Sequence, residues 1–319
     1  MEKTEETSKN CYTNKYLITG YNGQLGYEVK KQLLNNGIKE ENILAVDINE
    51  MDITKEDEVL KVVKNFNPNI IYHCAAWTAV DKAEEPDNQK KCYTVNVIGT
   101  KNMVKAAREV NAKIIYISTD YVFDGTKNNI YKVDDKTNPK SVYGLTKFMG
   151  EEEVRKYVNS FVIRTAWVFG INGKNFVKTM LDLSKKYETL RVVNDQIGTP
   201  TYAKDLARVA YELSLTNKFG TYHCTNSGYC TWAEFASYIL KDTNTKVIPV
   251  STFDYYEPQY EKAKSENKNL YIAYRPKNSI LDKSKLEEVG IKLPQDWKSA
   301  TDEFIYELKQ YENQKIKVK

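Results

Sequence analysis

The chain has 319 residues, of which 41% are hydrophobic and 28% are charged. This length and composition are typical of a globular protein that buries a large core and has room for two lobes. Its 47 basic and 43 acidic residues are interspersed and give a net charge of +4, which does not favour nucleic acid as a partner. The longest apolar runs, such as 69–76, are too short to cross a bilayer, so no membrane association is predicted.

The first 14 residues are polar and charged and lack the apolar centre of a secretion signal, so we expect a disordered leader. The five cysteines are scattered along the chain, odd in number and without a Cys-x-x-Cys spacing. We therefore expect free thiols in a reducing cytoplasm, and we predict neither a disulfide nor a zinc site.

A glycine-rich turn follows the first predicted strand, the short apolar run 15–19. Gly20, Gly23 and Gly26 are spaced three residues apart and lead into a helical pattern. Such a turn lets the backbone approach a pyrophosphate, which then lies at the positive N-terminal end of the helix. The alternative is an ordinary turn between a strand and a helix.

Asp47 ends the next predicted strand, 43–46, about 20 residues after the glycine turn, where an acidic residue meets the adenosine ribose of a dinucleotide. An acid at this position favours NAD over NADP, because it would repel the 2′-phosphate; a helix cap is the alternative. Asp52 and Ile53 are placed to touch the adenine end. Equally, Asp52 or Thr54 is suited to cap a helix over 55–66.

Small residues follow the third predicted strand, 69–74, and would let a cofactor lie close to the sheet edge. The fourth strand, 113–118, brings Thr119 to the same edge. Thr119 is suited to donate a hydrogen bond to a substrate carbonyl; a helix cap or a turn is the alternative.

A long helix is predicted over 88–110, and Asn96 falls in its middle. The Asn96 side chain either orients water or backbone near the site or faces solvent. His73 and His223, the two histidines, have apolar neighbours and are expected to be core residues rather than catalysts.

Tyr143 and Lys147 are four residues apart and share one face of a predicted helix. An ammonium beside a phenol favours the phenolate, so Lys147 is predicted to lower the pKa of Tyr143 from its usual value of about 10. A phenol tuned in this way passes a proton to or from a sugar oxygen, and Lys147 is also placed to hold a ribose. A solvated helix face is the alternative; the glycine turn and the strand ends before this pair favour catalysis.

A fifth strand, 160–164, completes an alternation of strands and helices that indicates a doubly wound parallel sheet. Trp167 follows it and either walls a pocket or packs in the core. Residues 251–273 are charged, tyrosine-rich and without a clear period, so we expect a mobile loop there. Helices are predicted around 203–215, 232–240, 281–289 and 299–311.

The predicted fold class is therefore α/β. We expect a Rossmann-type doubly wound sheet over 15–165 and a smaller substrate-binding lobe over 166–319, some of whose segments return to the sheet.

Eight segments carry a resemblance to a known family. They are GYNGQLG (20–26), MDIT (51–54), AAWTAVDKAE (75–84), STDYVFDG (118–125), VYGLTK (142–147), RTAWVFG (164–170), VVNDQIGTPT (192–201) and RPKNSILD (275–282). On these segments the chain resembles the extended short-chain dehydrogenase/reductases, and within them it is similar to the dTDP-4-dehydrorhamnose reductases over residues 16–307.

The resemblance implies catalytic, cofactor-binding and substrate-binding sets of residues. The implied catalytic residues are Thr119, Tyr143 and Lys147. The residues implied to bind the cofactor, NADPH or NADH, are Gly20, Asn22, Gly23, Gln24, Leu25, Gly26, Asp47, Asp52, Ile53, Ala75, Ala76, Thr78, Tyr143 and Lys147. Those implied to face the sugar are Thr119, Asp120, Tyr121, Tyr143 and Trp167.

The implied reaction is hydride transfer to C4 of a dTDP-linked 4-keto sugar, with Tyr143 donating the proton. Its substrate would be dTDP-4-dehydro-6-deoxy-L-mannose and its product dTDP-L-rhamnose. A homodimer is a further expectation. Some members bind Mg²⁺ at a dimer contact, and Glu28 matches one ligand position; the other ligands are not placed, so we assign no metal.

The chain departs from the family pattern at two places. Cys74 stands where the family has Asn before the alanine pair, and the stretch 251–273 is longer than usual. The first departure alters hydrogen bonding near the cofactor, and the second concerns one wall of the sugar pocket.

Three rival functions remain on the same scaffold, because fold alone does not determine function. A nucleotide-sugar 4,6-dehydratase would need a Glu base where this chain has Tyr121, so elimination is disfavoured. Another nucleotide-sugar 4-reductase or a 4-epimerase needs only the Tyr/Lys pair and a cofactor. The third rival is a non-catalytic NADP-binding regulatory subunit, and the intact set of Thr119, Tyr143 and Lys147 counts against it.

Overall fold

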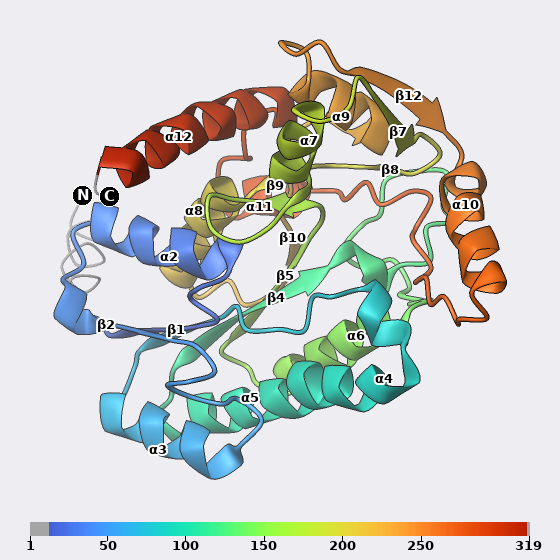
Figure 1. The fold of residues 1–319 in the computed structure, drawn as a ribbon. Coiled ribbons are helices and arrows are strands. Elements are labelled where there is room, and N and C mark those ends of the chain that lie inside the picture. The colour runs from blue at the N-terminus through green and yellow to red at the C-terminus, as the bar shows by residue number, and fades with distance from the viewer. Residues whose placement is uncertain (1–12, 318–319) are drawn as a thin grey trace.

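The computed structural model describes residues 13–317, so most of the predicted leader and the last two residues of the chain lie outside the described residues. A six-stranded parallel sheet forms the centre, in the order β10-β5-β4-β3-β1-β2 (Figure 1). Its strands are β1 (Tyr16–Thr19), β2 (Ile43–Val46), β3 (Ile70–His73), β4 (Lys113–Thr119), β5 (Ser160–Thr165) and β10 (Gly220–His223). This topology confirms the predicted fold class.

The central strands are short apolar runs because helices cover both faces of the sheet and leave little of each strand in contact with water. Every residue of β1, β3 and β5 is buried. The five strands predicted from such runs are all present, each within a residue or two of its predicted bounds. The sixth, β10, was not predicted; it comes from the C-terminal half and pairs with β5.

The helices pack as two layers on the sheet. One layer buries the side of the sheet marked by Leu17, Ile71 and Ile114; the other packs on Ile18, Tyr72 and Ile163. The first consists of α3 (Glu56–Phe66), α5 (Thr100–Glu109) and α6 (Val142–Arg155), with α4 (Pro86–Tyr93) beside it; the second contains α2 (Gln24–Asn35), α8 (Ala203–Ser214) and α11 (Ser284–Glu288) (Figure 1).

A smaller lobe sits above one edge of the sheet and has a core of its own, centred on Phe169, Phe235 and Phe304 (Figure 1). Its helices are α7 (Phe176–Ser184), α9 (Trp232–Ile239), α10 (Thr252–Ser265) and α12 (Trp297–Lys317). Its strands form three two-stranded sheets: β6 (Val168–Phe169) with β9 (Thr201–Tyr202), β7 (Thr189–Val193) with β12 (Lys246–Val250), and β8 (Ile197–Gly198) with β11 (Cys230–Thr231).

Two local predictions were wrong, and a third is confirmed with one irregularity. The N-cap of α3 is Lys55 rather than Asp52 or Thr54, because the Asp52 carboxylate bonds within its own turn and accepts from the Thr54 amide. The long helix predicted over 88–110 is present over 86–109, with a π-helical turn, Thr94–Gly99, between α4 and α5. In the stretch 251–273, expected to be a mobile loop, residues 252–265 instead form α10, an exposed helix without buried residues that accommodates Pro258; residues 266–273 are without helix or strand.

Four described cysteines, Cys74, Cys92, Cys224 and Cys230, are free thiols as predicted, whereas Cys11 lies outside the described part of the chain. Both histidines are buried core residues, which confirms that prediction too. None of the helices between residues 13 and 317 has the length and apolar character that a membrane span requires.

Candidate active site

A cavity of about 1160 Å³ runs along the carboxyl ends of the strands and reaches up to the smaller lobe. All the residues implied to be catalytic, cofactor-binding or sugar-facing line it except Asn22. Those present are Gly20, Gly23, Gln24, Leu25, Gly26, Asp47, Asp52, Ile53, Ala75, Ala76, Thr78, Thr119, Asp120, Tyr121, Tyr143, Lys147 and Trp167. Ligands of open α/β sheets bind at this edge, so the cavity is the candidate active site.

The glycine turn is shaped by backbone crowding. A β-carbon at Gly20 would lie 2.7 Å from the Cα of Ala75, and Gly20 also has a φ of +64°, a conformation that favours glycine. A β-carbon at Gly26 would collide with the Gly20 carbonyl oxygen. Helix α2 begins here with Gly23 as its N-cap and no side-chain cap, so its first backbone N–H groups are suited to a pyrophosphate. This turn fits a dinucleotide cofactor.

Asn22 takes part through its backbone. Its N–H donates to the Asp47 carboxylate (3.3 Å), and its carbonyl accepts from the Asn172 side chain (2.7 Å). Asp47 accepts a second hydrogen bond from the Ile48 N–H (2.9 Å) and lines the cavity. It caps no helix, so that interpretation was wrong, and its position beside the glycine turn agrees with a place near a ribose.

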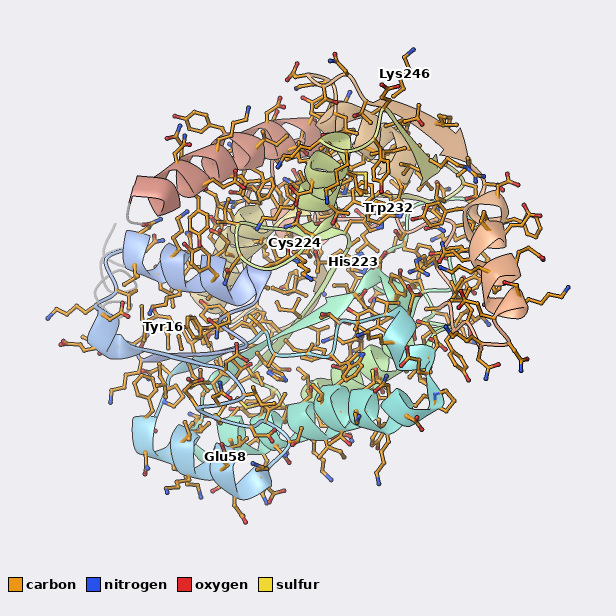
Figure 2. The ribbon with its side chains drawn as sticks, in the orientation of Figure 1. Tyr16, Glu58, His223, Cys224, Trp232 and Lys246 are labelled. Carbon is orange, nitrogen blue, oxygen red and sulfur yellow. The ribbon has the colours of Figure 1, made fainter. Side chains whose placement is uncertain are left out.

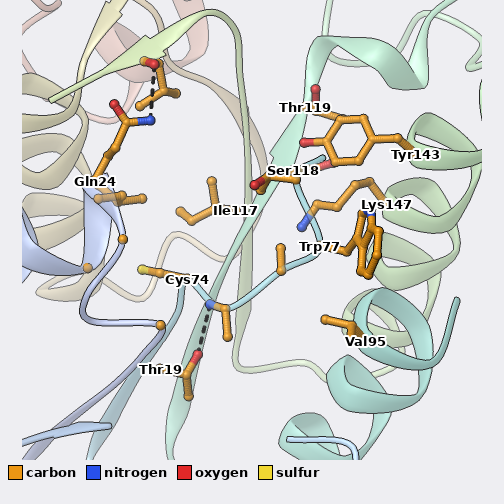
Figure 3. Close-up of a pocket in the computed structure, with 18 of the residues that line it drawn as sticks. Thr19, Gln24, Cys74, Trp77, Val95, Ile117, Ser118, Thr119, Tyr143 and Lys147 are labelled. Carbon is orange, nitrogen blue, oxygen red and sulfur yellow. Dashed lines mark hydrogen bonds between the residues drawn. The ribbon is translucent and has the colours of Figure 1, made fainter. Parts of the chain in front are cut away.

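Two polar side chains, Thr19 and His73, fix the position of the backbone that follows β3 along the cavity. The Ala75 N–H donates to the Thr19 hydroxyl (3.1 Å; Figure 3). The Thr19 hydroxyl in turn lies 2.9 Å from His73 Nδ1. Burial, with a contribution from the Lys147 charge, lowers the pKa of His73 to about 3, so the imidazole is neutral. Burial likewise raises the pKa of the neighbouring Cys74 thiol to about 12, so the position where the family has Asn is neutral as well.

Asn96 connects this backbone to the catalytic helix. Its side chain accepts from the Trp77 N–H (2.8 Å) and donates to the Thr146 hydroxyl of α6 (3.0 Å). Asn96 is 1% exposed and lies in the π-helical turn, a feature often found at functional sites. The solvent-facing alternative is therefore wrong, and Asn96 orients backbone beside the cavity.

Helix α6 presents Tyr143 and Lys147 to the cavity from one face, as predicted (Figure 3). Its N-cap, Ser141, accepts from the Gly144 N–H (3.1 Å). A β-carbon at Gly144 would collide with the Tyr121 carbonyl, so glycine is what lets α6 approach the end of β4. The Lys147 ammonium lies 4.1 Å from the centre of the Tyr116 ring.

The predicted effect of Lys147 on Tyr143 was wrong. Burial raises the pKa of Tyr143 well above its usual value, and the opposing influence is a hydrogen bond with Thr119 rather than the charge of Lys147. Burial also lowers the pKa of Lys147 to about 7, against the attraction of Glu151. Tyr143 is consequently a protonated phenol at neutral pH, which is the form that a proton donor needs.

Thr119 lies at the end of β4 and forms hydrogen bonds with the two residues that follow it. Its hydroxyl donates to Asp120 Oδ1 (2.9 Å) and accepts from the Tyr121 N–H (3.3 Å), so the cap interpretation is confirmed for the 3₁₀ turn Asp120–Val122. Burial raises the pKa of Asp120 to about 6. The Tyr121 and Tyr143 rings meet edge to face, 5.5 Å between centroids, at the same rim.

Two buried hydroxyls in the cavity have no hydrogen-bond partner among the described residues. They belong to Ser118 and Thr165, and Thr165 is the direct neighbour of Thr119 in the β4–β5 register. Buried polar atoms in native proteins are nearly always hydrogen-bonded, so both are available to a ligand. Neither hydroxyl was predicted to belong to the site, although their places at the ends of β4 and β5 were a usable signal.

Trp167 and Trp232 form the wall of the cavity that belongs to the smaller lobe. Trp167 has a φ of +48°, a left-handed conformation that costs a residue other than glycine about 1–3 kcal/mol. Trp232 was missed because nothing in its local sequence links it to a strand end many residues earlier.

Glu28 lies in α2 but does not line the cavity. Its carboxyl is buried, and burial raises its pKa, with Lys31 and Lys204 opposing that effect. In residues 13–317 no group of three or more His, Cys, Asp or Glu side chains is arranged to hold a metal ion.

Comparison with known proteins identifies close relatives. The family model of the RmlD substrate binding domain matches residues 14–310. The spore coat polysaccharide biosynthesis protein SpsK of Bacillus subtilis is 38% identical over 92% of this chain and 97% of that protein. A dTDP-4-dehydrorhamnose reductase of Aggregatibacter actinomycetemcomitans is 38% identical over 89% of this chain and 96% of that enzyme.

A solved structure of a dTDP-4-dehydrorhamnose reductase also has a fold similar to that of this chain. The dTDP-4-dehydrorhamnose reductase of Bacillus anthracis, crystallised in complex with NADP, superposes with a TM-score of 0.84 at 38% identity. The match covers 92% of this chain and 99% of that one.

Proposed function

This chain belongs to the RmlD substrate binding domain family, and from that premise we propose its function. It catalyses the NAD(P)H-dependent reduction of the C4 keto group of dTDP-4-dehydro-6-deoxy-L-mannose, which gives dTDP-L-rhamnose. The observation that carries the proposal is the convergence of Thr119, Tyr143 and Lys147 on one cavity with the glycine turn.

The two ends of the cavity would divide the work of binding. The glycine turn and Asp47 would hold the pyrophosphate and adenosine ribose of the cofactor, and Lys147 would hold the ribose next to the nicotinamide. When bound, NADPH or NADH supplies the hydride. Asp47 leads us to expect that NADH is used at least as well as NADPH.

Proton transfer falls to the α6 side of the cavity. Thr119 would turn its hydroxyl proton from Asp120 Oδ1 to the sugar carbonyl oxygen and so orient that carbonyl. Tyr143 would donate its phenolic proton to the same oxygen as C4 becomes tetrahedral. Tyr143 is protonated before the reaction, as a donor must be, and its raised pKa makes it a weaker acid than a free phenol. Trp167, Asp120 and Tyr121 would line the sugar.

The residues of the site also favour reduction over two related reactions of nucleotide sugars, 4,6-elimination and 4-epimerisation. Tyr121 lines the cavity where a 4,6-dehydratase would need a carboxylate base, so elimination lacks its base. A 4-epimerase would return the hydride to the sugar and consume no reduced cofactor, which separates it from a reductase in a simple assay.

We expect the enzyme to act in the cytoplasm, and the free thiols of the described cysteines support a reducing compartment. A homodimer remains a prediction, which light scattering of the purified protein would test.

The function is tested by mixing the protein with NADH or NADPH and a panel of nucleotide-linked 4-keto sugars while following the absorbance of the reduced nicotinamide. We expect the dTDP-linked 4-keto-6-deoxy sugar to be reduced fastest. Cofactor binding without oxidation by any sugar would favour a regulatory subunit, and a strong preference for NADPH would contradict the interpretation of Asp47.

A further inference from the structure

Trp167 is held in a strained conformation at the mouth of the cavity. Its φ of +48° is unusual for a bulky side chain. The residue lies between β5 and β6, and its carbonyl accepts from the Thr201 N–H (3.1 Å), which continues the pairing of β6 with β9. Strain of this kind persists only where surrounding contacts over-determine the conformation.

Trp232 supplies the main contact. The two indole rings stack with centroids 3.6 Å apart and planes 12° from parallel. Trp232 is the first residue of α9 and is fixed from behind by Phe176, whose ring centroid lies 4.6 Å away. The preceding N-cap, Thr231, forms a reciprocal capping box with Glu234, so the start of the helix is rigid. Figure 2 shows Trp232 in the smaller lobe, above the sheet.

Gly198 leaves the space that Trp167 occupies. A β-carbon at Gly198 would lie 2.8 Å from two carbons of the Trp167 ring and 2.6 Å from Ser279 Oγ. Gly198 has no positive φ, so an alanine there would be resisted by crowding alone. The Trp167 ring thus has Trp232 stacked against it and Gly198 close to its six-membered ring, and both tryptophans line the cavity.

We infer that Trp232 is a positioning residue for substrate recognition, because it holds Trp167 in the orientation that forms a flat wall against the sugar nucleotide. The inference rests on the proposed function and adds to it a residue outside the predicted catalytic, cofactor and sugar sets. An aromatic platform suits a sugar or base ring, and a two-ring stack is stiffer than one indole. Core packing alone would make Trp232 matter for stability and leave substrate affinity unchanged.

The test compares Trp232→Ala, Trp232→Phe and the control Trp297→Phe. Trp297 belongs to the same lobe core, packs on Phe235 and Tyr238, and does not line the cavity. A stacked tryptophan pair gives an exciton couplet in the far-ultraviolet circular dichroism spectrum. The measurements are this couplet, the KM for the sugar nucleotide, and the Kd for NADPH.

We expect Trp232→Ala to lose the couplet and to raise the KM about tenfold or more, with the Kd for NADPH within twofold of wild type. Trp232→Phe, which keeps a smaller stacked ring, should be intermediate, and Trp297→Phe should match wild type. Loss of the couplet with an unchanged KM would overturn the inference, and so would an equal rise in KM for Trp297→Phe.

If Trp232→Ala does not fold, Gly198→Ala is compared with Ser279→Ala, because the added methyl group crowds both Trp167 and Ser279 Oγ, whereas Ser279→Ala removes that hydroxyl without crowding Trp167. We expect Gly198→Ala to weaken the exciton couplet and to raise the KM for the sugar nucleotide. A weakened couplet with a wild-type KM would overturn the inference. If the wild-type protein reduces no 4-keto sugar, the proposed function fails separately. In that case the Kd for dTDP is measured for the same variants. We expect it to rise most for Trp232→Ala, less for Trp232→Phe and not at all for Trp297→Phe.

Discussion

The Tyr143 hydroxyl is the proton donor in the proposed reaction. Tyr143→Phe removes that proton and keeps the ring that packs against Tyr121. We predict a loss of turnover of about 10²-fold or more, the usual scale for a missing general acid, with cofactor affinity nearly unchanged. Stopped-flow reduction and cofactor titration measure the two effects. Wild-type turnover by this variant would remove Tyr143 from the mechanism.

Lys147 links function to stability at the residue scale. Its pKa falls from 10.5 in the unfolded chain to about 7 in the folded protein, because burial disfavours the ammonium. Between those two values the unfolded state binds more protons than the folded state, so the stability of the wild-type protein rises with pH. The penalty of burying the ammonium is therefore largest below pH 7 and is progressively relieved towards pH 10.5.

We predict that Lys147→Met raises the free energy of unfolding, and that the gain is about 2 kcal/mol larger at pH 6 than at pH 9. Urea unfolding of both proteins at the two pH values measures this difference. The variant should also lose cofactor affinity, since the ribose loses its cationic partner. A gain equal at both pH values, or larger at pH 9, would show that Lys147 is not the buried group described here.

A buried ion pair attaches α6 to the sheet at the element scale. Arg164 of β5 donates two hydrogen bonds to the Glu151 carboxylate, both of 2.9 Å, and both side chains are almost fully buried. Removing one partner of such a pair leaves an uncompensated charge. We predict that Glu151→Gln lowers the free energy of unfolding by about 3 kcal/mol, as measured by urea unfolding.

Glu151 also attracts the Lys147 charge, so Glu151→Gln should shift the pKa of Lys147 further down. The control is the double replacement Glu151→Leu with Arg164→Met, which removes both charges and should recover much of the lost stability. A double variant as unstable as the single one would mean that packing, rather than charge pairing, attaches α6 to β5.

Elements with a clear period could be predicted from the sequence, and those whose form depends on distant partners could not. The apolar runs that form β1 to β5 are recognisable without knowing which strands lie beside them, so the local sequence pattern was sufficient to predict these strands. Helix α10 has no buried residue and hence no apolar stripe to detect. The strand β10 is four residues long and is recognisable only once β5 lies beside it.

The residues of the site likewise fall into those that could be predicted from the sequence and those that could not. Residues at strand ends and on α6 could be placed because the doubly wound topology brings them to one edge. Two features depended on tertiary burial and escaped the sequence: the raised pKa of Tyr143 and the Trp232 stack. A spacing of four residues predicts proximity, but it carries no information on how deeply the two groups are buried.

The cavity as a whole joins the two halves of the molecule. The sheet edge contributes the glycine turn and the α6 pair, and the smaller lobe contributes Trp232. In the proposed reaction, a hydride would pass from a cofactor on the sheet side to a sugar on the side of the smaller lobe, so both halves would be required.

The most direct test uses NADPH deuterated at the transferable C4 position, together with the dTDP-linked 4-keto sugar, and reads the product by mass spectrometry and NMR. We predict dTDP-L-rhamnose carrying one deuterium, at C4 of the sugar, and no such product from Tyr143→Phe on the same timescale. A product without that deuterium, or cofactor that stays fully reduced while the sugar is bound, would contradict the assignment of this cavity as a 4-keto reductase site.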